Sequence, residues 1–218
     1  MEKTIKVTGT GSLSVKPDTT VLHIQLQGSE KQYAKACSKA AEAAEELRGV
    51  FASLGFAPEE LKTVSFSVNA KQEGYTDKNG NYRTRQTGYE YYQGLKISFA
   101  CSNERLSLCL TALAKAACNP LFSIEYTVKN PESAKNKLLR LAVKDSEKKA
   151  KVLAAAAGKS LGEVLFMDYS WGQMNLSVRP VAFAAEKRLA ACEDAIAVDI
   201  NPEDIRIEDT VTVLWALQ

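Results

Sequence analysis

Two segments near the ends of the chain alternate apolar and polar residues without a break, and they constrain the fold more than any other feature. They are VTGTGSLSVKPD at residues 7–18 and PEDIRIEDTVTVLWAL at residues 202–217. A period of two residues is typical of a strand with one buried face and one wet face, as in an antiparallel sheet. We therefore expect both ends of the chain to be sheet strands of one compact body.

Composition bounds the class of protein. The 218 residues are enough for a sizeable core, and 28 basic against 26 acidic residues give a net charge of only +2. Such a chain has no global field that would attract nucleic acid or an anionic membrane. The apolar run VLAAAAG at 152–158 is too short to span a bilayer. The start, MEKTIKVTG, lacks a secretory signal, so we expect a cytoplasmic protein, exported only if a signal peptide has been removed.

The hydrophobic periodicity predicts the element order ββαββαβαββ, with helices layered on an antiparallel sheet. This is an α+β fold, and no linker-like tract divides it, so we expect a single domain over residues 1–218. Similar helix–glycine–strand units in the two halves indicate a pseudo-repeat. The segment 172–202 is the least periodic, and it is expected to be an irregular segment or to hold a short helix around 182–195.

Capping signals place the two long helices. Ser29 to Gln32 resembles a capping box that opens the first, which Gly55 ends, and Asn130-Pro131 opens the third, which Gly158 ends. The predicted buried stripe of the third helix consists of Leu139, Ala142, Val143, Ser146, Ala150, Leu153 and Ala157.

The candidates for chemistry are weak. Gly158-Lys159-Ser160 ends a helix rather than opening one, so it is not a phosphate-binding loop. Gly9-x-Gly11 lies within a strand and indicates a bulge or the close approach of another backbone. The single histidine, His23, is expected on the wet face of a strand without a partner. The five cysteines form no C-x-x-C pair, and we interpret them as reduced, mostly buried thiols. We expect no catalytic, metal-binding or cofactor-binding residues.

The hairpin at residues 71–92 has the one unusual surface. Asn79-Gly80 predicts a type I′ turn, which needs positive φ at both residues. Around it, aromatic and basic residues interleave, and the candidate interface or binding residues are Tyr75, Tyr82, Arg83, Arg85, Tyr89, Tyr91 and Tyr92. Such a surface can stack on single-stranded nucleic acid, but tyrosine and arginine are also preferred at protein interfaces. The nearly neutral charge favours a contact with a neighbouring subunit.

Four segments resemble the SIMPL domain family, which includes periplasmic and outer-membrane immunogenic members. They are VTGTGSLSVKPD (7–18), LGFAPEELKTVSFSV (54–68), AVKDSEKKAKVLAAAAGKSLGEV (142–164) and IRIEDTVTVLWAL (205–217). The resemblance implies an α+β domain that tends to self-assemble, with loose links to stress tolerance and, in animals, to a kinase-associated signalling partner. It brings no established active site, so it assigns no catalytic residue.

These observations favour a non-enzymatic, self-associating scaffold or stress-related binding protein of bacterial type. Two alternatives stay open. One is a module for single-stranded nucleic acid or another polyanion that uses the 71–92 hairpin, and the other is an enzyme with an unrecognised site near 172–202.

Overall fold

The computed structural model describes residues 3–169, 176–178 and 199–218, and the chain divides into two compact units. Unit 1 comprises residues 1–18, 127–178 and 202–218, and unit 2 comprises residues 19–126 and 179–201. The elements follow the predicted order ββαββαβαββ with one added two-residue strand, which confirms the α+β class. The single domain over residues 1–218 stays a prediction. The helix expected around 182–195 lies outside the described residues.

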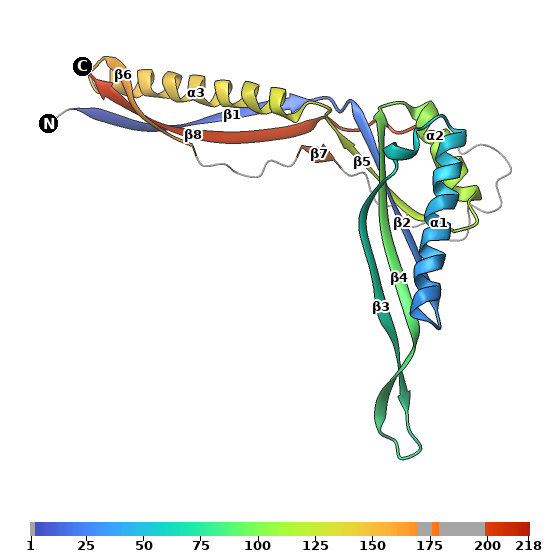
Figure 1. The fold of residues 1–218 in the computed structure, drawn as a ribbon. Coiled ribbons are helices and arrows are strands. Elements are labelled where there is room, and N and C mark those ends of the chain that lie inside the picture. The colour runs from blue at the N-terminus through green and yellow to red at the C-terminus, as the bar shows by residue number, and fades with distance from the viewer. Residues whose placement is uncertain (1–2, 170–175, 179–198) are drawn as a thin grey trace. The chain divides into compact units, whose positions relative to one another are not determined.

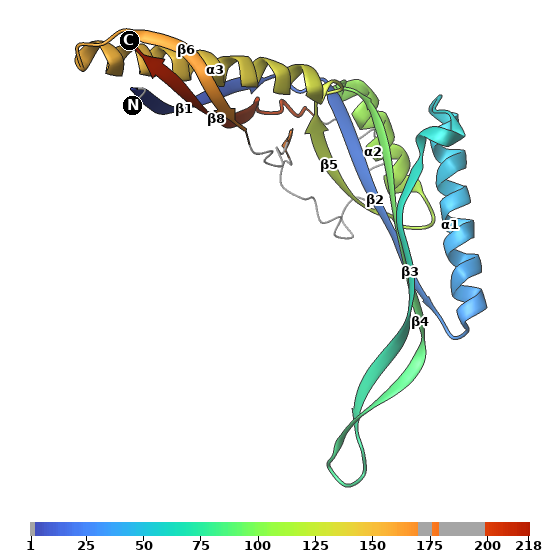
Figure 2. The ribbon, with the colours of Figure 1, turned by 60° about the vertical axis from the view of Figure 1, so that its left-hand side comes forward.

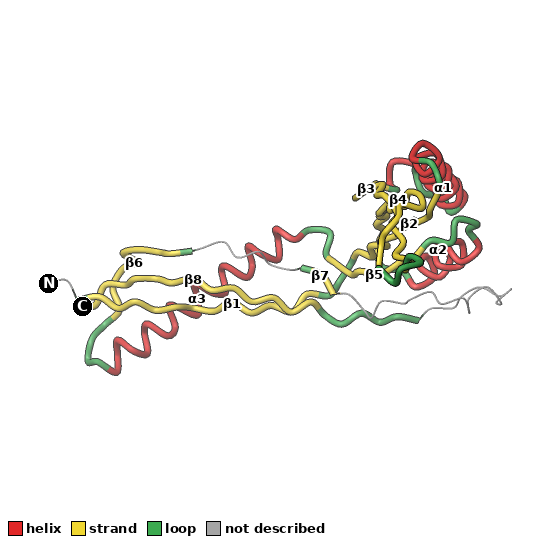
Figure 3. The backbone as a smooth tube through the Cα atoms, turned by 90° about the horizontal axis from the view of Figure 1, so that it is seen from below, coloured by secondary structure: helices red, strands yellow, loops and turns green. Residues whose placement is uncertain are grey.

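Unit 1 is a three-stranded antiparallel sheet with one helix on it (Figures 1 and 3). The strand order is β1 (Thr4–Val15), β8 (Ile205–Leu217) and β6 (Leu161–Asp168). β1 and β8 pair over their whole length, from Thr4 opposite Ala216 to Val15 opposite Ile205. The prediction that both ends of the chain are sheet strands is therefore confirmed. A two-residue strand, β7 (Ser177–Val178), also falls within the residues of unit 1 but is not part of this sheet.

Helix α3 (Pro131–Ala156) lies very close to β1. Its N-terminus is capped as predicted, because the Asn130 side chain accepts a hydrogen bond from the Ser133 N–H at 3.1 Å. Gly11 faces the helix backbone so tightly that a Cβ there would lie 2.3 Å from the Leu138 carbonyl oxygen. The close approach expected at the Gly9-x-Gly11 pair is thus confirmed. Gly158, at φ +67°, ends the helical segment in the left-handed conformation expected of a cap.

The buried stripe of α3 is rotated relative to the prediction. Leu153 is 51% exposed and Ala157 is exposed too, so both were wrongly assigned to the core. The buried side chains recur mainly every fourth residue and are Ala134, Leu138, Ala142, Ser146, Ala150 and Ala154. Small residues dominate this row because the helix must approach the two glycines of β1. Among them, the buried Ser146 hydroxyl donates to the Val7 carbonyl and accepts from the Trp215 indole N–H.

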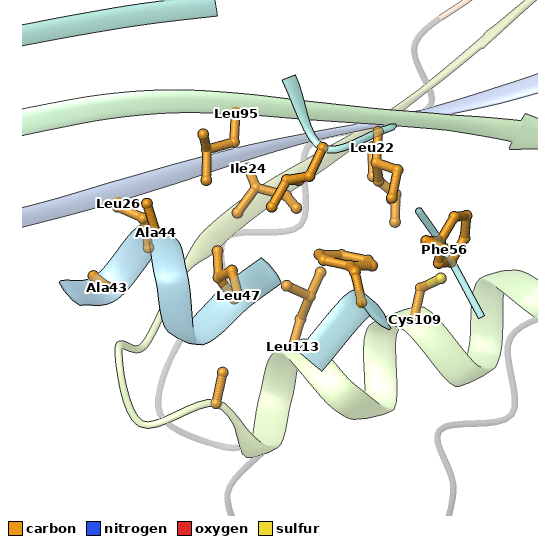
Figure 4. Packing of buried hydrophobic residues seen from close by; sticks show 14 of the residues in the cluster. Leu22, Ile24, Leu26, Ala43, Ala44, Leu47, Phe56, Leu95, Cys109 and Leu113 are labelled. Atoms are coloured by element: carbon orange, nitrogen blue, oxygen red, sulfur yellow. The ribbon is translucent and has the colours of Figure 1, made fainter. Parts of the chain in front are cut away.

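Unit 2 is a sheet covered on one face by two helices. The strand order is β3 (Lys62–Thr76), β4 (Tyr82–Ala100), β2 (Thr19–Glu30) and β5 (Leu121–Thr127). The helices are α1 (Tyr33–Ser53) and α2 (Asn103–Lys115), and a 3-10 turn, η1, spans Pro58–Glu60. Figure 4 shows the core between them, where Leu47 and Leu113 of the helices meet Ile24 and Leu95 of the sheet.

The start of α1 differs from the prediction. Ser29 and Glu30 are still paired in β2, and the helix begins after Gln32, whose side chain makes no capping hydrogen bond. The prediction of a capping box at Ser29–Gln32 was therefore wrong. The reason is that the long β4 offers β2 backbone partners as far as Glu30, so the ladder outcompetes the local cap at these residues.

Candidate binding surface on the β3–β4 ribbon

The two strands of the predicted hairpin form a ribbon that outruns the rest of its sheet. The last pair of β2 with β4 is Glu30 opposite Tyr89, whereas β3 and β4 stay paired as far as Thr76 opposite Tyr82. Figure 2 shows this part continuing beyond the ends of β2 and α1. We call residues 72–86 the distal ribbon. All of its residues are exposed except Asp77, which is half-buried.

The tip of the distal ribbon is organised by Asp77. Its Oδ1 accepts the backbone N–H groups of Asn79 and Asn81 at 2.9 and 3.0 Å, and its Oδ2 accepts Arg83 Nε–H at 2.8 Å. These bonds, led by the Asn81 N–H, hold the pKa of the Asp77 carboxyl below its ordinary value. The tip is thus an ordered loop rather than a loose end.

The turn type at the tip corrects the prediction. Gly80 has φ +83°, but Asn79 is not in the positive-φ region, so this is not a type I′ turn. Instead the Gly80 N–H donates to the Asp77 carbonyl and the Asp77 N–H donates to the Asn81 carbonyl. A β-turn followed by a left-handed glycine is the usual longer hairpin connection. The side chain of Asp77 favours it by accepting two of the loop's N–H groups.

Four of the seven predicted surface residues gather on the distal ribbon. Arg85 lies over the ring of Tyr75, 5.5 Å from its centroid, and Arg83 is ion-paired with Asp77. Tyr82 is 76% exposed, and its ring lies against Gly74, where a Cβ would meet the phenol oxygen at 1.9 Å. An aromatic ring over a strand glycine covers bare backbone that would otherwise face water.

The other three predicted residues lie at the base of the ribbon and differ in role. Tyr91 is buried in the core beneath α1, against Gly28, and burial raises the pKa of its phenol. Tyr89 is half-buried and meets Tyr33 edge to face, with ring centroids 5.6 Å apart. Tyr92 points to the other face, is 37% exposed and donates to Glu90. Of these three tyrosines, only Tyr92 has an exposed side chain.

A shallow concavity on the face of the sheet opposite the helices is a feature that the sequence did not reveal. It has a volume of about 400 Å³ and lies over Gly94, where a Cβ would meet Ser65 Oγ at 2.6 Å. Gln25 and Tyr92 also line it. Gly94 inside a strand was the one feature of the sequence that could have indicated this concavity. Its shape could not be predicted, because it depends on which strands are neighbours in the sheet.

His23 borders this concavity and has a partner, contrary to expectation. Its Nε2 lies 2.7 Å from Glu125 Oε2 across to β5, and the two side chains are 36% and 15% exposed. His23 does lie on the open face, as predicted. The carboxylate was missed because nothing local in the sequence shows that residues 23 and 125 are neighbours.

The described cysteines are free thiols but are less buried than expected. Cys37, Cys101, Cys109 and Cys118 are free thiols, but Cys101 is exposed and only Cys109 is fully buried. The expectation that they are mostly buried was therefore wrong for the four that are described. Burial raises the pKa of Cys109 and of Cys118 to about 11. In the described ranges no three His, Cys, Asp or Glu side chains gather as metal ligands.

The alternative site near 172–202 falls mainly on residues that the structure does not describe, so it stays a hypothesis. No helix in the described ranges is both long enough and apolar enough to cross a membrane.

Comparison with known proteins identifies the family. The sequence profile of the SIMPL family, described as "Protein of unknown function (DUF541)", matches residues 5–215. The chain therefore belongs to the SIMPL family. It is 22% identical over 213 residues to "Uncharacterized protein YggE" of Edwardsiella ictaluri, covering 98% of this chain and 86% of that protein.

A second relative carries a cellular location in its name. The chain is 25% identical over 161 residues to the "26 kDa periplasmic immunogenic protein" of Brucella melitensis biotype 1. The match covers 74% of this chain and 64% of the Brucella protein, which is slightly under two thirds.

Proposed function

We propose that this chain is a non-enzymatic, self-associating scaffold or binding protein, and that the distal ribbon is its assembly arm. The observation that carries the proposal is the ribbon itself. From residue 72 to residue 86 it is ordered, two-stranded and exposed along nearly its whole length. An isolated two-stranded hairpin is at best marginally stable in water, so burial against a partner is the natural source of additional stability.

The side chains of the distal ribbon suit a protein partner. Tyr75 and Tyr82 are 41% and 76% exposed, and Arg85 holds its guanidinium over Tyr75. Tyrosine and arginine are enriched at interfaces because they bury a large area while making polar contacts. Their cross-strand packing also fixes their positions before binding, which reduces the entropy lost on association.

The charges favour protein over a polyanion. Residues 71–92 hold four basic side chains (Lys71, Lys78, Arg83, Arg85) and three acidic ones (Glu73, Asp77, Glu90), a net charge of +1. Two of the four cations are already ion-paired, Arg83 with Asp77 at 2.8 Å and Lys71 with Glu90 at 3.3 Å. Binding to single-stranded nucleic acid needs cations free to replace counterions on phosphates. Nucleic-acid binding is therefore our second candidate. An electrophoretic shift of single-stranded nucleic acid at low salt, abolished by Arg83→Ala with Arg85→Ala, would favour it over the protein partner.

The cellular role is proposed on the family resemblance alone. It implies a stress-related binding protein, and we propose the cytoplasm as its location, with export as the alternative because the Brucella relative is named as periplasmic. Fractionation of cells that express the full-length gene product decides between the two compartments.

The test of the assembly arm compares matched surface variants. Sedimentation velocity of the wild type should show an assembly larger than one chain, and Tyr82→Ala with Arg85→Ala should weaken it at least tenfold. Val152→Ala, at a 69% exposed position of α3 in unit 1, serves as the control and should leave it unchanged. A wild type that sediments as one chain at all concentrations would overturn the proposal, and saturable turnover in a broad substrate screen would overturn its non-enzymatic part.

A further inference from the structure

The outer edge of β3 is open to another strand. β3 lies at the edge of its sheet (Figure 1), and within the described ranges β4 is the strand that pairs with it. The backbone N–H and C=O groups on its far side therefore have no strand partner among the described residues. Residues 63–70, TVSFSVNA, hold neither a charge nor a proline. Those are the residue types with which proteins usually block an edge strand.

The same segment exposes large apolar side chains. Val64 is 58% exposed and Phe66 is 51% exposed, whereas Val68 two residues further on packs partly against the core. Phe66 lies opposite Gln93 of β4, on the face that carries α1. An exposed phenylalanine in an uncharged edge strand marks an interaction surface.

We propose that β3 pairs antiparallel with β3 of a second copy about a twofold axis at Phe66. In a twofold contact, residue i faces residue j of the other copy and j faces i. The sequence Ser65-Phe66-Ser67 reads the same in both directions, so it is complementary to itself in this register. Phe66 meets Phe66 of the second copy, and Ser65 meets Ser67 of the second copy. Aromatic–aromatic and hydroxyl–hydroxyl pairs are favourable across antiparallel strands.

Charge complementarity supports the same register. Pairing with β4 shifts between Thr63 and Ser65, which leaves Val64 outside the ladder. Carried to the outer edge, this bulge places Lys62 opposite Asn69 of the second copy. Asn69 in turn lies opposite Glu90 of β4, whose carboxylate already pairs with Lys71 at 3.3 Å and would receive the Lys62 ammonium as a second cation. The twofold axis creates this attraction twice.

The size of the contact connects it to the assembly arm. A few paired residues bury less than the roughly 1,600 Å² of a typical stable interface. The edge contact therefore rests on the proposed self-association, in which the distal ribbon supplies the remaining area, but it uses different residues and can be tested separately.

Disulfide trapping tests the register on the full chain. In a Cys101→Ser background, which removes the thiol that is exposed among the four described cysteines, Phe66→Cys should give a disulfide-linked dimer under mild oxidation on a non-reducing gel, and the Cys101→Ser parent alone should not. Only residue 66 faces itself, so Ser65→Cys and Ser67→Cys should each give little dimer alone, while an equilibrated mixture of the two should give a heterodimer. Val152→Cys, at a 69% exposed position of α3, measures random collision.

The outcomes separate the edge contact from the arm. Phe66→Cys dimer no stronger than that of Val152→Cys would overturn the edge pairing even if arm variants dissociate the assembly. Equally strong trapping by Ser65→Cys alone would overturn this register. As a second readout that needs no cysteine, Phe66→Lys should weaken association at least tenfold in sedimentation, with Val152→Lys unchanged. If arm variants leave the mass unaltered while Phe66→Cys is trapped, the arm proposal fails and the edge contact stands.

Discussion

Gly9 of β1 lies against Ala142 of α3 so closely that a Cβ on Gly9 would be 2.1 Å from the Ala142 carbonyl oxygen. Real Cβ atoms do not approach backbone to that distance, so glycine is required there for the helix to pack on the strand. The two glycines near the start of the chain therefore serve helix packing rather than phosphate binding. Ser146, the next buried residue of α3 after Ala142, accepts a hydrogen bond from the indole N–H of Trp215 in β8.

Gly9→Ala should therefore destabilise the fold by about 3 kcal/mol, the upper range for overpacking a tight contact, because helix backbone must move. Urea unfolding followed by circular dichroism measures this. Gly49→Ala is the matched control, because Gly49 is exposed within α1 and has nothing within 4 Å of an added Cβ. That change should stabilise by about 0.5–1 kcal/mol through helix propensity. Equal effects of the two changes would contradict the packing account.

Gln93 offers a gain in stability. Its side chain is 7% exposed, and its Oε1 is buried without a hydrogen-bond partner among the described residues. Gln93→Leu removes this unsatisfied group and should raise the free energy of unfolding by about 1 kcal/mol. Gln25→Leu, on the exposed face of neighbouring β2, should change it by less than about 0.5 kcal/mol. A loss of stability in Gln93→Leu would show that a bound water or another group satisfies the amide.

The tip of the distal ribbon should respond to acid through Asp77. The N–H of Asn81 and the other donors hold the pKa of this carboxyl below its ordinary value. Protonation of Asp77 should therefore weaken these hydrogen bonds and disorder the tip. The ordered tip is fully favoured above the unfolded pKa of about 3.9 and is lost as pH falls through the lower folded value. The backbone amide shift of Asn81 in an NMR titration reports this. A midpoint at or above 3.9, or an unchanged titration in Asp77→Asn, would be inconsistent with the hydrogen-bonded loop.

The thiols should differ in reactivity. With pKa values raised to about 11 by burial, Cys109 and Cys118 carry only about a thousandth of their population as thiolate at pH 8. Cys101 is exposed and should be alkylated by iodoacetamide before either of these two. Peptide mapping by mass spectrometry after short exposures gives the order. Labelling of Cys109 as fast as Cys101 in the folded protein would show that its site opens readily.

Much of the fold could be predicted from the sequence because periodicity is local. Alternation in residues 7–18 and 202–217 indicated β1 and β8, and Asn130, Pro131 and Gly158 marked the ends of α3. The rotation of α3 could not be predicted. Leu153 has the spacing of a core residue, yet the helix turns small residues toward Gly9 and Gly11 and leaves Leu153 half exposed.

The candidate surface was predictable to the same degree. The interleaved tyrosines and arginines located the ribbon, but not which of them face the core, because Tyr91 is buried only where α1 crosses β4. The concavity over Gly94 and the pair of His23 with Glu125 depend on strands far apart in sequence becoming neighbours. Turn type also escaped prediction, because Asp77 lies outside the Asn79-Gly80 dipeptide that the rule considers.

The most direct test of self-association through the arm is the absolute mass in solution, by light scattering behind a sizing column. The wild type is compared with a variant in which residues 74–86 are replaced by a short turn, and its retained fold is checked by circular dichroism. We predict a multimer for the wild type and a smaller species for the variant. A single-chain mass for both, or the same multimer for both, would contradict the assigned role of the distal ribbon.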